Sequence, residues 1–210
     1  MDMVLASGNQ KKLRELTDIL QPLGITLLPQ SEFGVPEAEE TGLTFVENAI
    51  IKARNAAAYT GLPAISDDSG LEVDALNGAP GIYSARFAGP DASDADNNAE
   101  LVRQLRASSN HTGNTGNKDA DTFPARYQCV IVFLRHAADP VPIICQGSWE
   151  GAIHLTPQGD GGFGYDPHFF ACDAQCSAAD MSAAEKHRLS HRGKALADFM
   201  AVARRRLLVR

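Results

Sequence analysis

The chain has 210 residues, of which 44% are hydrophobic and 21% are charged. These proportions are ordinary for a globular domain and exclude a chain that is mainly disordered. The length predicts one domain over residues 1–210, built as one body or as two lobes. The formal net charge of −7 makes nucleic acid and anionic membranes poor electrostatic partners, so we expect neither.

Targeting segments and cysteine chemistry are the next features to consider. No apolar run reaches the roughly 18 residues that a membrane span needs, and residues 1–4 resemble no secretory signal. We therefore expect a cytoplasmic protein. Cys129, Cys145, Cys172 and Cys176 form no C-x-x-C pair, which favours reduced thiols, some of them buried, over a zinc site.

Strands and helices are expected to alternate in the first part of the chain. Residues 3–6 and 25–28 are short apolar runs and predict strands, and the leucine spacing between them predicts a helix that ends near Pro22. Residues 30–42 are polar and predict a loop. Residues 44–60 predict a helix with an apolar stripe on one side and Thr44, Asn48, Lys52 and Asn55 on the other.

The remaining elements follow from the same patterns. Residues 64–66 predict a short strand that leads into Asp67, residues 94–107 a helix that Asp94 can cap, and residues 108–122 a polar surface loop. A hairpin is expected from residues 126–135 and 141–149. The C-terminal helix, about residues 183–208, is interrupted near residues 190–193. Early alternation and later local pairing together predict a mixed sheet.

A glycine-bearing turn stands between the first strand and the first helix. Its residues are Ser7, Gly8, Asn9, Gln10, Lys11 and Lys12. Backbone N–H groups at a helix start attract phosphate, and lysine adds a positive charge. The motif is not a Walker A loop. An ordinary turn with two solvated lysines remains an alternative for this segment.

Two acidic doublets, Glu39-Glu40 and Asp67-Asp68, are candidates for a Mg²⁺ site. If each doublet is extended, its two side chains point to opposite faces, and only one carboxylate of each can serve a common site. The pattern does not decide which one. Asp67-Asp68-Ser69-Gly70 is the stronger candidate, because catalytic groups often follow an apolar strand. A solvated acidic loop and an aspartate turn are the alternative.

Two later segments favour a nucleotide ligand. In residues 161–167 an aromatic side chain, Phe163, stands between glycines and offers a face on which a base can stack. Lys186 and residues 190–194 are basic in an otherwise acidic chain, and their side chains are hydrogen-bond donors for phosphate or for a purine carbonyl. A tight loop with a buried phenylalanine and a solvated basic helix face are the alternatives.

Taken in order, these segments resemble the inosine/xanthosine triphosphate pyrophosphatase family over about residues 3–200. The matching pieces are Ser7-Gly8-Asn9 with Lys12, residues 39–45 with 47–49, residues 67–71, 78–86 and 161–167, and residues 190–193. The resemblance implies an elongated two-lobed α/β body with a long twisted mixed sheet, flanking helices and a central active-site cleft. It also implies a homodimer that requires Mg²⁺ and cleaves ITP, dITP or XTP to the monophosphate and pyrophosphate.

The resemblance also implies a role for each site residue. Glu40 and Asp68 would bind the metal, and Asp68 would be the general base, while Glu39 and Asp67 would be supporting or outward-facing. The implied substrate-binding residues are Ser7, Gly8, Asn9, Gln10, Lys11, Lys12, Lys52 and Ser69 for the phosphates, Phe163, Gly164, Tyr165 and Asp166 for the base, and Lys186, His191 and Arg192 to complete the nucleotide site.

Two other functions are compatible with the same motifs. One is a pyrophosphatase for other altered nucleotides, such as methylated pyrimidine triphosphates. The other is a nucleotide-binding regulator that kept the fold without turnover. A panel of nucleoside triphosphates with pyrophosphate detection distinguishes all three.

Overall fold

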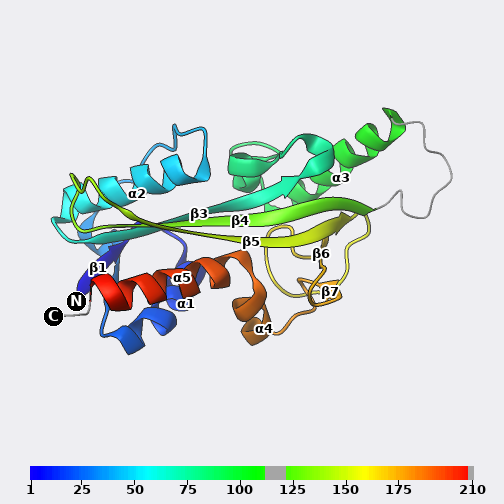
Figure 1. Cartoon of the computed structure of the whole chain (residues 1–210). Coiled ribbons are helices and arrows are strands. Elements are labelled where there is room, and N and C mark those ends of the chain that lie inside the picture. The colour runs from blue at the N-terminus through cyan, green and yellow to red at the C-terminus, as the bar shows by residue number, and fades with distance from the viewer. Residues whose placement is uncertain (112–121, 208–210) are drawn as a thin grey trace. The chain divides into compact units, whose positions relative to one another are not determined.

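The computed structural model describes residues 1–111 and 122–207 (Figure 1). Within these ranges the chain forms an α/β fold whose seven-stranded mixed sheet has the order β2-β1-β3-β4-β5-β6-β7. The strands are β1 (Asp2–Leu5), β2 (Thr26–Pro29), β3 (Ala64–Val73), β4 (Thr122–Leu134), β5 (Ile143–His154), β6 (Phe169–Ala171) and β7 (Cys176–Ser177). The helices are α1 (Gln10–Leu20), α2 (Phe45–Thr60), α3 (Asp94–His111), α4 (Ala183–Leu189) and α5 (His191–Arg206).

The sheet is mixed, as the order of predicted elements indicates. β1 pairs in parallel with β2 and β3, whereas β6 pairs antiparallel with β5 and β7. The chain divides into two compact units. Unit 1 comprises Met1–Asp68, Cys129–Gly147 and Lys194–Arg210, and unit 2 comprises Ser69–Gln128 and Ser148–Gly193. β3, β4 and β5 each contribute residues to both units.

Unit 1 has helices on both faces of its strands. Side chains of β4 alternate: Cys129, Ile131 and Phe133 pack in an apolar cluster with α1 and α5, whereas Val130 and Val132 pack against α2. Figure 1 shows α2 on one side of these strands and α1 and α5 on the other. The strand period of two therefore gives unit 1 two apolar layers.

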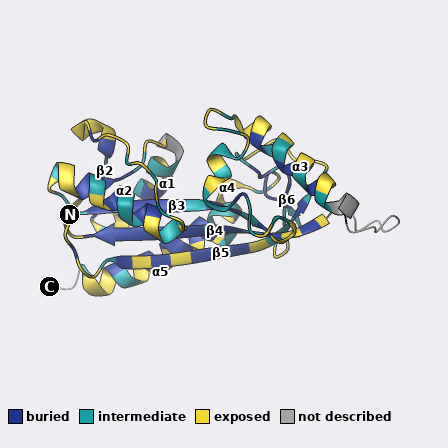
Figure 2. Ribbon diagram, turned by 90° about the horizontal axis from the view of Figure 1, so that it is seen from above, coloured by how far each residue is buried: buried dark blue, intermediate teal, exposed yellow. Residues whose placement is uncertain are grey.

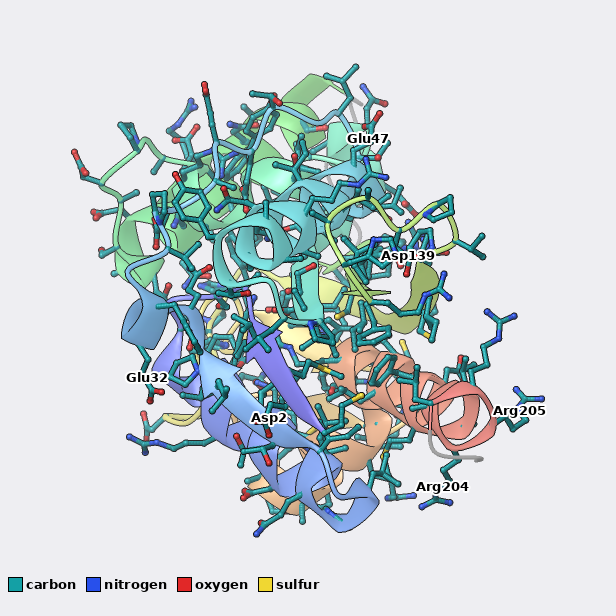
Figure 3. The ribbon with its side chains drawn as sticks, turned by 90° about the vertical axis from the view of Figure 1, so that its left-hand side faces the viewer. Asp2, Glu32, Glu47, Asp139, Arg204 and Arg205 are labelled. Atoms are coloured by element: carbon teal, nitrogen blue, oxygen red, sulfur yellow. The ribbon has the colours of Figure 1, made fainter. Side chains whose placement is uncertain are left out.

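The helices of unit 1 begin and end at residues that suit these positions. Thr44 accepts a hydrogen bond from the backbone of Glu47 and caps α2, and Gly61, at φ 68°, ends it. The last turn of α5 contains arginines, whose positive charge is favourable at a helix C-terminus. Arg204 and Arg205 extend outward from this helix (Figure 3).

The core of unit 2 is aromatic. Leu101 and Leu105 of α3 pack in a cluster with Tyr127, Trp149 and Phe169. The ring of Phe169 lies 4.7 Å from that of Tyr127 and 5.1 Å from that of Trp149, measured between centroids. Figure 2 shows that the strands are largely buried, whereas each helix has a buried side and an exposed side.

Several element boundaries differ from the predicted ones. β3 runs to Val73 instead of stopping at residue 66, so Asp67 and Asp68 lie inside a strand. Residues 30–33 form a 3-10 helix within the predicted loop, and α1 is followed by another at Gln21–Leu23. Further 3-10 turns are Asp74–Leu76 and Gly81–Arg86. Each of these turns has too few residues to show helical periodicity in the sequence.

The later predictions are largely confirmed. The hairpin forms, since β4 and β5 are neighbours in the sheet, and the C-terminal helix breaks at Ser190, between α4 and α5. α3 extends to His111, so the first residues of the predicted polar loop are helical, and residues 112–121 lie outside the described part of the chain. No helix in the described ranges has both the length and the hydropathy that crossing a membrane takes.

Candidate active site

The turn between β1 and α1 is organised by its own side chains. The backbone N–H of Asn9 donates to Oγ of Ser7 at 3.2 Å, and the backbone N–H of Lys12 donates to Oδ1 of Asn9 at 3.2 Å. Asn9 thus caps the start of α1. Gly8 is exposed. The side chains of Gln10 and Lys11, also predicted here, lie outside the described part of the structure.

Two lysine–carboxylate contacts connect β3 with the helices on either side of it. Lys12 Nζ lies 2.9 Å from Oδ2 of Asp67, whose side chain is fully buried. Lys52 Nζ, from α2, lies 2.7 Å from Oδ1 of Asp68 and 2.9 Å from Oε1 of Glu40. Within unit 1 the structure therefore pairs Lys12 with Asp67, and Lys52 with both Asp68 and Glu40.

The extended backbone of β3 determines which aspartate meets which helix. Successive side chains of a strand point to opposite faces, so Asp67 meets α1 and Asp68 meets α2. This confirms the expectation that only one carboxylate of the doublet shares a site with Glu40. The alternative of an aspartate turn is wrong, because both residues are strand residues. Asp67 is a buried partner of Lys12, and the outward-facing alternative is also wrong.

Burial and charge act in opposite directions on this cluster. Burial raises the pKa of the Asp68 carboxyl, and the charge of Lys52 only partly offsets that rise. Burial alone would lower the pKa of Lys52, but the charges of Asp68 and Asp67 outweigh it and raise that pKa. Lys52 therefore stays cationic, and Asp68 is more basic than an exposed aspartate.

The loop that carries Glu40 is fastened to the first turn of α2. The backbone N–H of Gly42 donates to Oδ1 of Asn48 at 2.8 Å, and that of Leu43 donates to Oε2 of Glu47 at 2.8 Å. A Cβ on Gly42 would lie 2.5 Å from Cβ of Glu47, so the backbone approach requires glycine. Asn48, predicted on the side of its helix opposite the apolar stripe, is fully buried.

In unit 2 the glycine-rich loop presents one aromatic ring. Phe163 is 44% exposed, so the alternative of a buried phenylalanine is wrong. Its backbone N–H donates to Oδ2 of Asp166 at 2.8 Å, and Lys186 forms an ion pair with the same oxygen. The Lys186 ammonium also lies 4.7 Å from the centroid of the Phe163 ring. Lys186 thus contacts the aromatic loop; its role as a phosphate contact stays a prediction.

The other predicted residues of unit 2 are mostly buried. Tyr165 is buried, and its hydroxyl donates to the carbonyl of Ser84 at 2.8 Å, so this side chain supports the loop from inside. Arg192 donates from Nη2 to Oγ of Ser69 at 3.2 Å. The ring of His191 stacks on that of Tyr127, with centroids 4.8 Å apart and planes at 14°.

Sequence reasoning missed Tyr127 and the anchors of the loop. Tyr127 is buried, and burial raises its pKa well above the usual value, so its hydroxyl stays protonated. Nothing in the sequence distinguishes it from any other aromatic residue in a strand. The prediction that Asp94 caps α3 is also wrong: Ser93 and Asp96 form the reciprocal capping contacts, with Ser93 N–H donating to Asp96 at 2.9 Å.

These contacts define a class of protein. A capped glycine turn at a helix start and lysines matched to buried carboxylates, on an α/β fold, are typical of proteins that bind phosphorylated ligands. The sequence model of the Ham1 family matches residues 3–202, and the chain therefore belongs to the Ham1 family.

Several relatives are similar over nearly the whole chain. The dITP/XTP pyrophosphatase of Thioalkalivibrio sulfidiphilus is 58% identical over 196 residues, which are 93% of this chain and 95% of that protein. The dITP/XTP pyrophosphatase of Vibrio cholerae is 55% identical over 194 residues, 92% of each chain. Among solved structures, a HAM1 protein from Coxiella burnetii has a TM-score of 0.88 and 46% identity, covering 98% of this chain and 99% of that one.

Proposed function

We propose that this protein hydrolyses the non-standard purine nucleoside triphosphates dITP, XTP and ITP to the monophosphate and pyrophosphate, with Mg²⁺ as cofactor. The observation that carries the proposal is the convergence of Glu40, Lys52 and Asp68 in unit 1. The names of relatives that are 58% and 55% identical over more than nine-tenths of the chain support the substrate class.

The carboxylates suit a hard divalent cation. Glu40 and Asp68 both contact the ammonium group of Lys52, and this supports a shared cation between their carboxylates. Among the described residues no three His, Cys, Asp or Glu side chains gather to hold a metal. Mg²⁺ commonly takes one or two carboxylates and completes its coordination with water and substrate phosphate. We therefore assign Glu40 and Asp68 as its ligands. When bound, the metal neutralises phosphate charge that would repel a nucleophile.

The chain's own residues then supply proton transfer and phosphate binding. Asp68 orients a water molecule and accepts its proton as the water oxygen attacks phosphorus and the bridging bond to pyrophosphate breaks. Lys12 and Lys52 exchange part of their carboxylate contacts for phosphate oxygens. The turn of Ser7, Gly8 and Asn9, with Ser69, donates further hydrogen bonds to the phosphates.

The base is read by residues of unit 2. The exposed ring of Phe163 offers a stacking face, with Asp166 and Lys186 fixing its loop. His191 and Arg192 are donors suited to the 6-oxo group of hypoxanthine or xanthine. Adenine has an amino group there and would leave those donors unpaired, which costs binding free energy.

The assembly and location are part of the same proposal. The family resemblance supports a homodimer that acts on a small-molecule substrate in the cytoplasm, without nucleic acid or membrane partners. Light scattering on the purified protein tests the dimer directly, with twice the chain mass expected and a monomer mass contradicting it.

A substrate panel tests the activity. Pyrophosphate release is measured with ITP, dITP, XTP, GTP and ATP at equal concentration, with Mg²⁺ and again with excess EDTA. We expect kcat/KM for the first three substrates to exceed that for ATP by at least about 100-fold, a ratio within reach of unpaired buried donors. Guanine carries the same 6-oxo group, so a lower kcat/KM for GTP requires a further contact at position 2 of the base. Activity that persists in EDTA would contradict the metal assignment, and equal rates on all five nucleotides would contradict the substrate class.

A further inference from the structure

The loop that carries Phe163 is held by the start of α3 as well as by Asp166. The backbone N–H of Gly164 donates to Oδ2 of Asp94 at 2.7 Å. The side-chain amide of Asn98 donates to the carbonyl of the same glycine at 2.8 Å. Asp94 and Asn98 are four residues apart and so lie on one face of the helix. Both backbone groups of Gly164 are therefore bound by one helical turn.

This clamp is stiffened from within the helix. The amide of Asn98 also donates to the carbonyl of Asp94 at 2.9 Å, so the two clamp residues are connected to each other. Gly164 has φ 61°, a conformation that favours glycine. A flexible glycine between two fixed hydrogen bonds loses the freedom that it would otherwise have.

The backbone around Phe163 is where such a clamp has an effect. The residue is 44% exposed, and the glycines beside it, Gly162 and Gly164, both have positive φ. The backbone N–H of Phe163 is fixed by Asp166, and the next residue is fixed by α3. The ring thus projects from a short segment of backbone that is tied at two consecutive residues.

We propose that Asp94 and Asn98 are positioning residues for base recognition, which set the place of the Phe163 ring through Gly164. The inference rests on the proposed function, in which a purine stacks on that ring. A preformed stacking face lowers the conformational entropy lost on binding. The phosphates of the substrate do not contact this loop in the proposed function, so the clamp acts on the nucleoside part alone.

The chain offers a matched control in the same helical turn. Asp96 accepts hydrogen bonds from the backbone and hydroxyl of Ser93, at 2.9 and 2.6 Å, and among the described residues it bonds to Ser93 instead of the loop. Asp94→Ala and Asp96→Ala each remove one carboxylate from the first turn of α3. Of these two variants, only Asp94→Ala frees the backbone N–H of Gly164. Asp94→Asn keeps an oxygen acceptor and serves as the conservative rescue.

Two measurements then test the clamp on the full chain. Hydrogen exchange without nucleotide should be faster over residues 161–166 in Asp94→Ala and Asn98→Ala than in wild type or Asp96→Ala. In turnover assays KM for ITP should rise about tenfold in Asp94→Ala, from partial loss of stacking, with a smaller change in kcat. The inhibition constant of pyrophosphate, which has no base, should stay unchanged, and Asp94→Asn should restore most of the affinity for ITP.

The outcomes separate the clamp from the proposed function. Loop exchange in Asp94→Ala equal to that in Asp96→Ala overturns the clamp. A parallel rise in KM for ITP and in the pyrophosphate inhibition constant overturns it as well, because that result is general structural damage. A wild-type protein that does not act on ITP overturns the proposed function instead, whatever the exchange rates are.

Discussion

Replacing each aspartate of the doublet by asparagine should have different consequences, because the two side chains lie on opposite faces of β3. Asp68→Asn removes the proposed base and a metal ligand while keeping the side-chain shape. Loss of general-base catalysis alone lowers kcat by about 10²–10⁴-fold, or about 3–5 kcal/mol of barrier. The contact of Lys52 with Glu40 remains, so the protein should stay folded.

Asp67→Asn should instead lower stability. Its carboxylate is fully buried against Lys12, whose side chain is 19% exposed and can recover part of its hydration. We therefore expect a loss of about 1–3 kcal/mol in the free energy of unfolding, below the full cost of breaking a buried ion pair. No proton transfer is assigned to Asp67, so kcat should fall by less than about tenfold.

Pyrophosphate release from ITP at saturating Mg²⁺ measures the loss of kcat. Urea unfolding of the same preparations measures the loss of unfolding free energy. The two variants should separate, with Asp68→Asn inactive and stable and Asp67→Asn active and less stable. An equal loss of kcat in both variants, with unfolding curves unchanged, would refute the opposite-face geometry as the basis of their roles.

Three further predictions concern the loop of Glu40, the base-reading donors and the hairpin. Gly42→Ala puts a Cβ 2.5 Å from that of Glu47, so a Mg²⁺ titration of activity should show about 10–100-fold weaker metal affinity. Arg192→Ala should lower the ratio of kcat/KM for ITP to kcat/KM for ATP, by an amount equivalent to about 1–3 kcal/mol. Lys12→Ala should lower kcat/KM for both substrates by similar factors. If Arg192→Ala lowers kcat/KM for both substrates equally, Arg192 contacts phosphate or supports the structure. Asp139 (labelled in Figure 3) is held by Arg135, which lowers its pKa, so its stabilisation exists above about pH 4 and is lost on acidification. Asp139→Asn should lower the free energy of unfolding by about 1–3 kcal/mol at pH 7. The unfolding free energy of the variant should also fall less steeply as the pH is lowered.

Residues whose role depends on local pattern were predictable. The stripe of α2, the break at Ser190 and the alternation of strands and helices follow from periodicity and from single turn residues. The opposite orientations of Asp67 and Asp68 were predictable only as a condition on an extended backbone. The extension itself was not, because two adjacent carboxylates favour a turn until lysines from two helices neutralise them.

Roles that depend on long-range contact were not predictable. Asn48 looks like a solvated helix residue until the Gly42 loop covers it. From its position Asp94 is expected to cap a helix, but its carboxylate accepts a hydrogen bond from Gly164, seventy positions along the chain. In both cases a short polar side chain has two equally good hydrogen-bonding choices, and only the tertiary fold decides between them.

The products of ITP hydrolysis show whether the protein is a pyrophosphatase. Phosphorus NMR of a completed reaction distinguishes cleavage that leaves pyrophosphate from cleavage that leaves orthophosphate. We expect inosine monophosphate and pyrophosphate in equal amounts, formed only with Mg²⁺ and not by Asp68→Asn. Inosine diphosphate and orthophosphate as the products would contradict it.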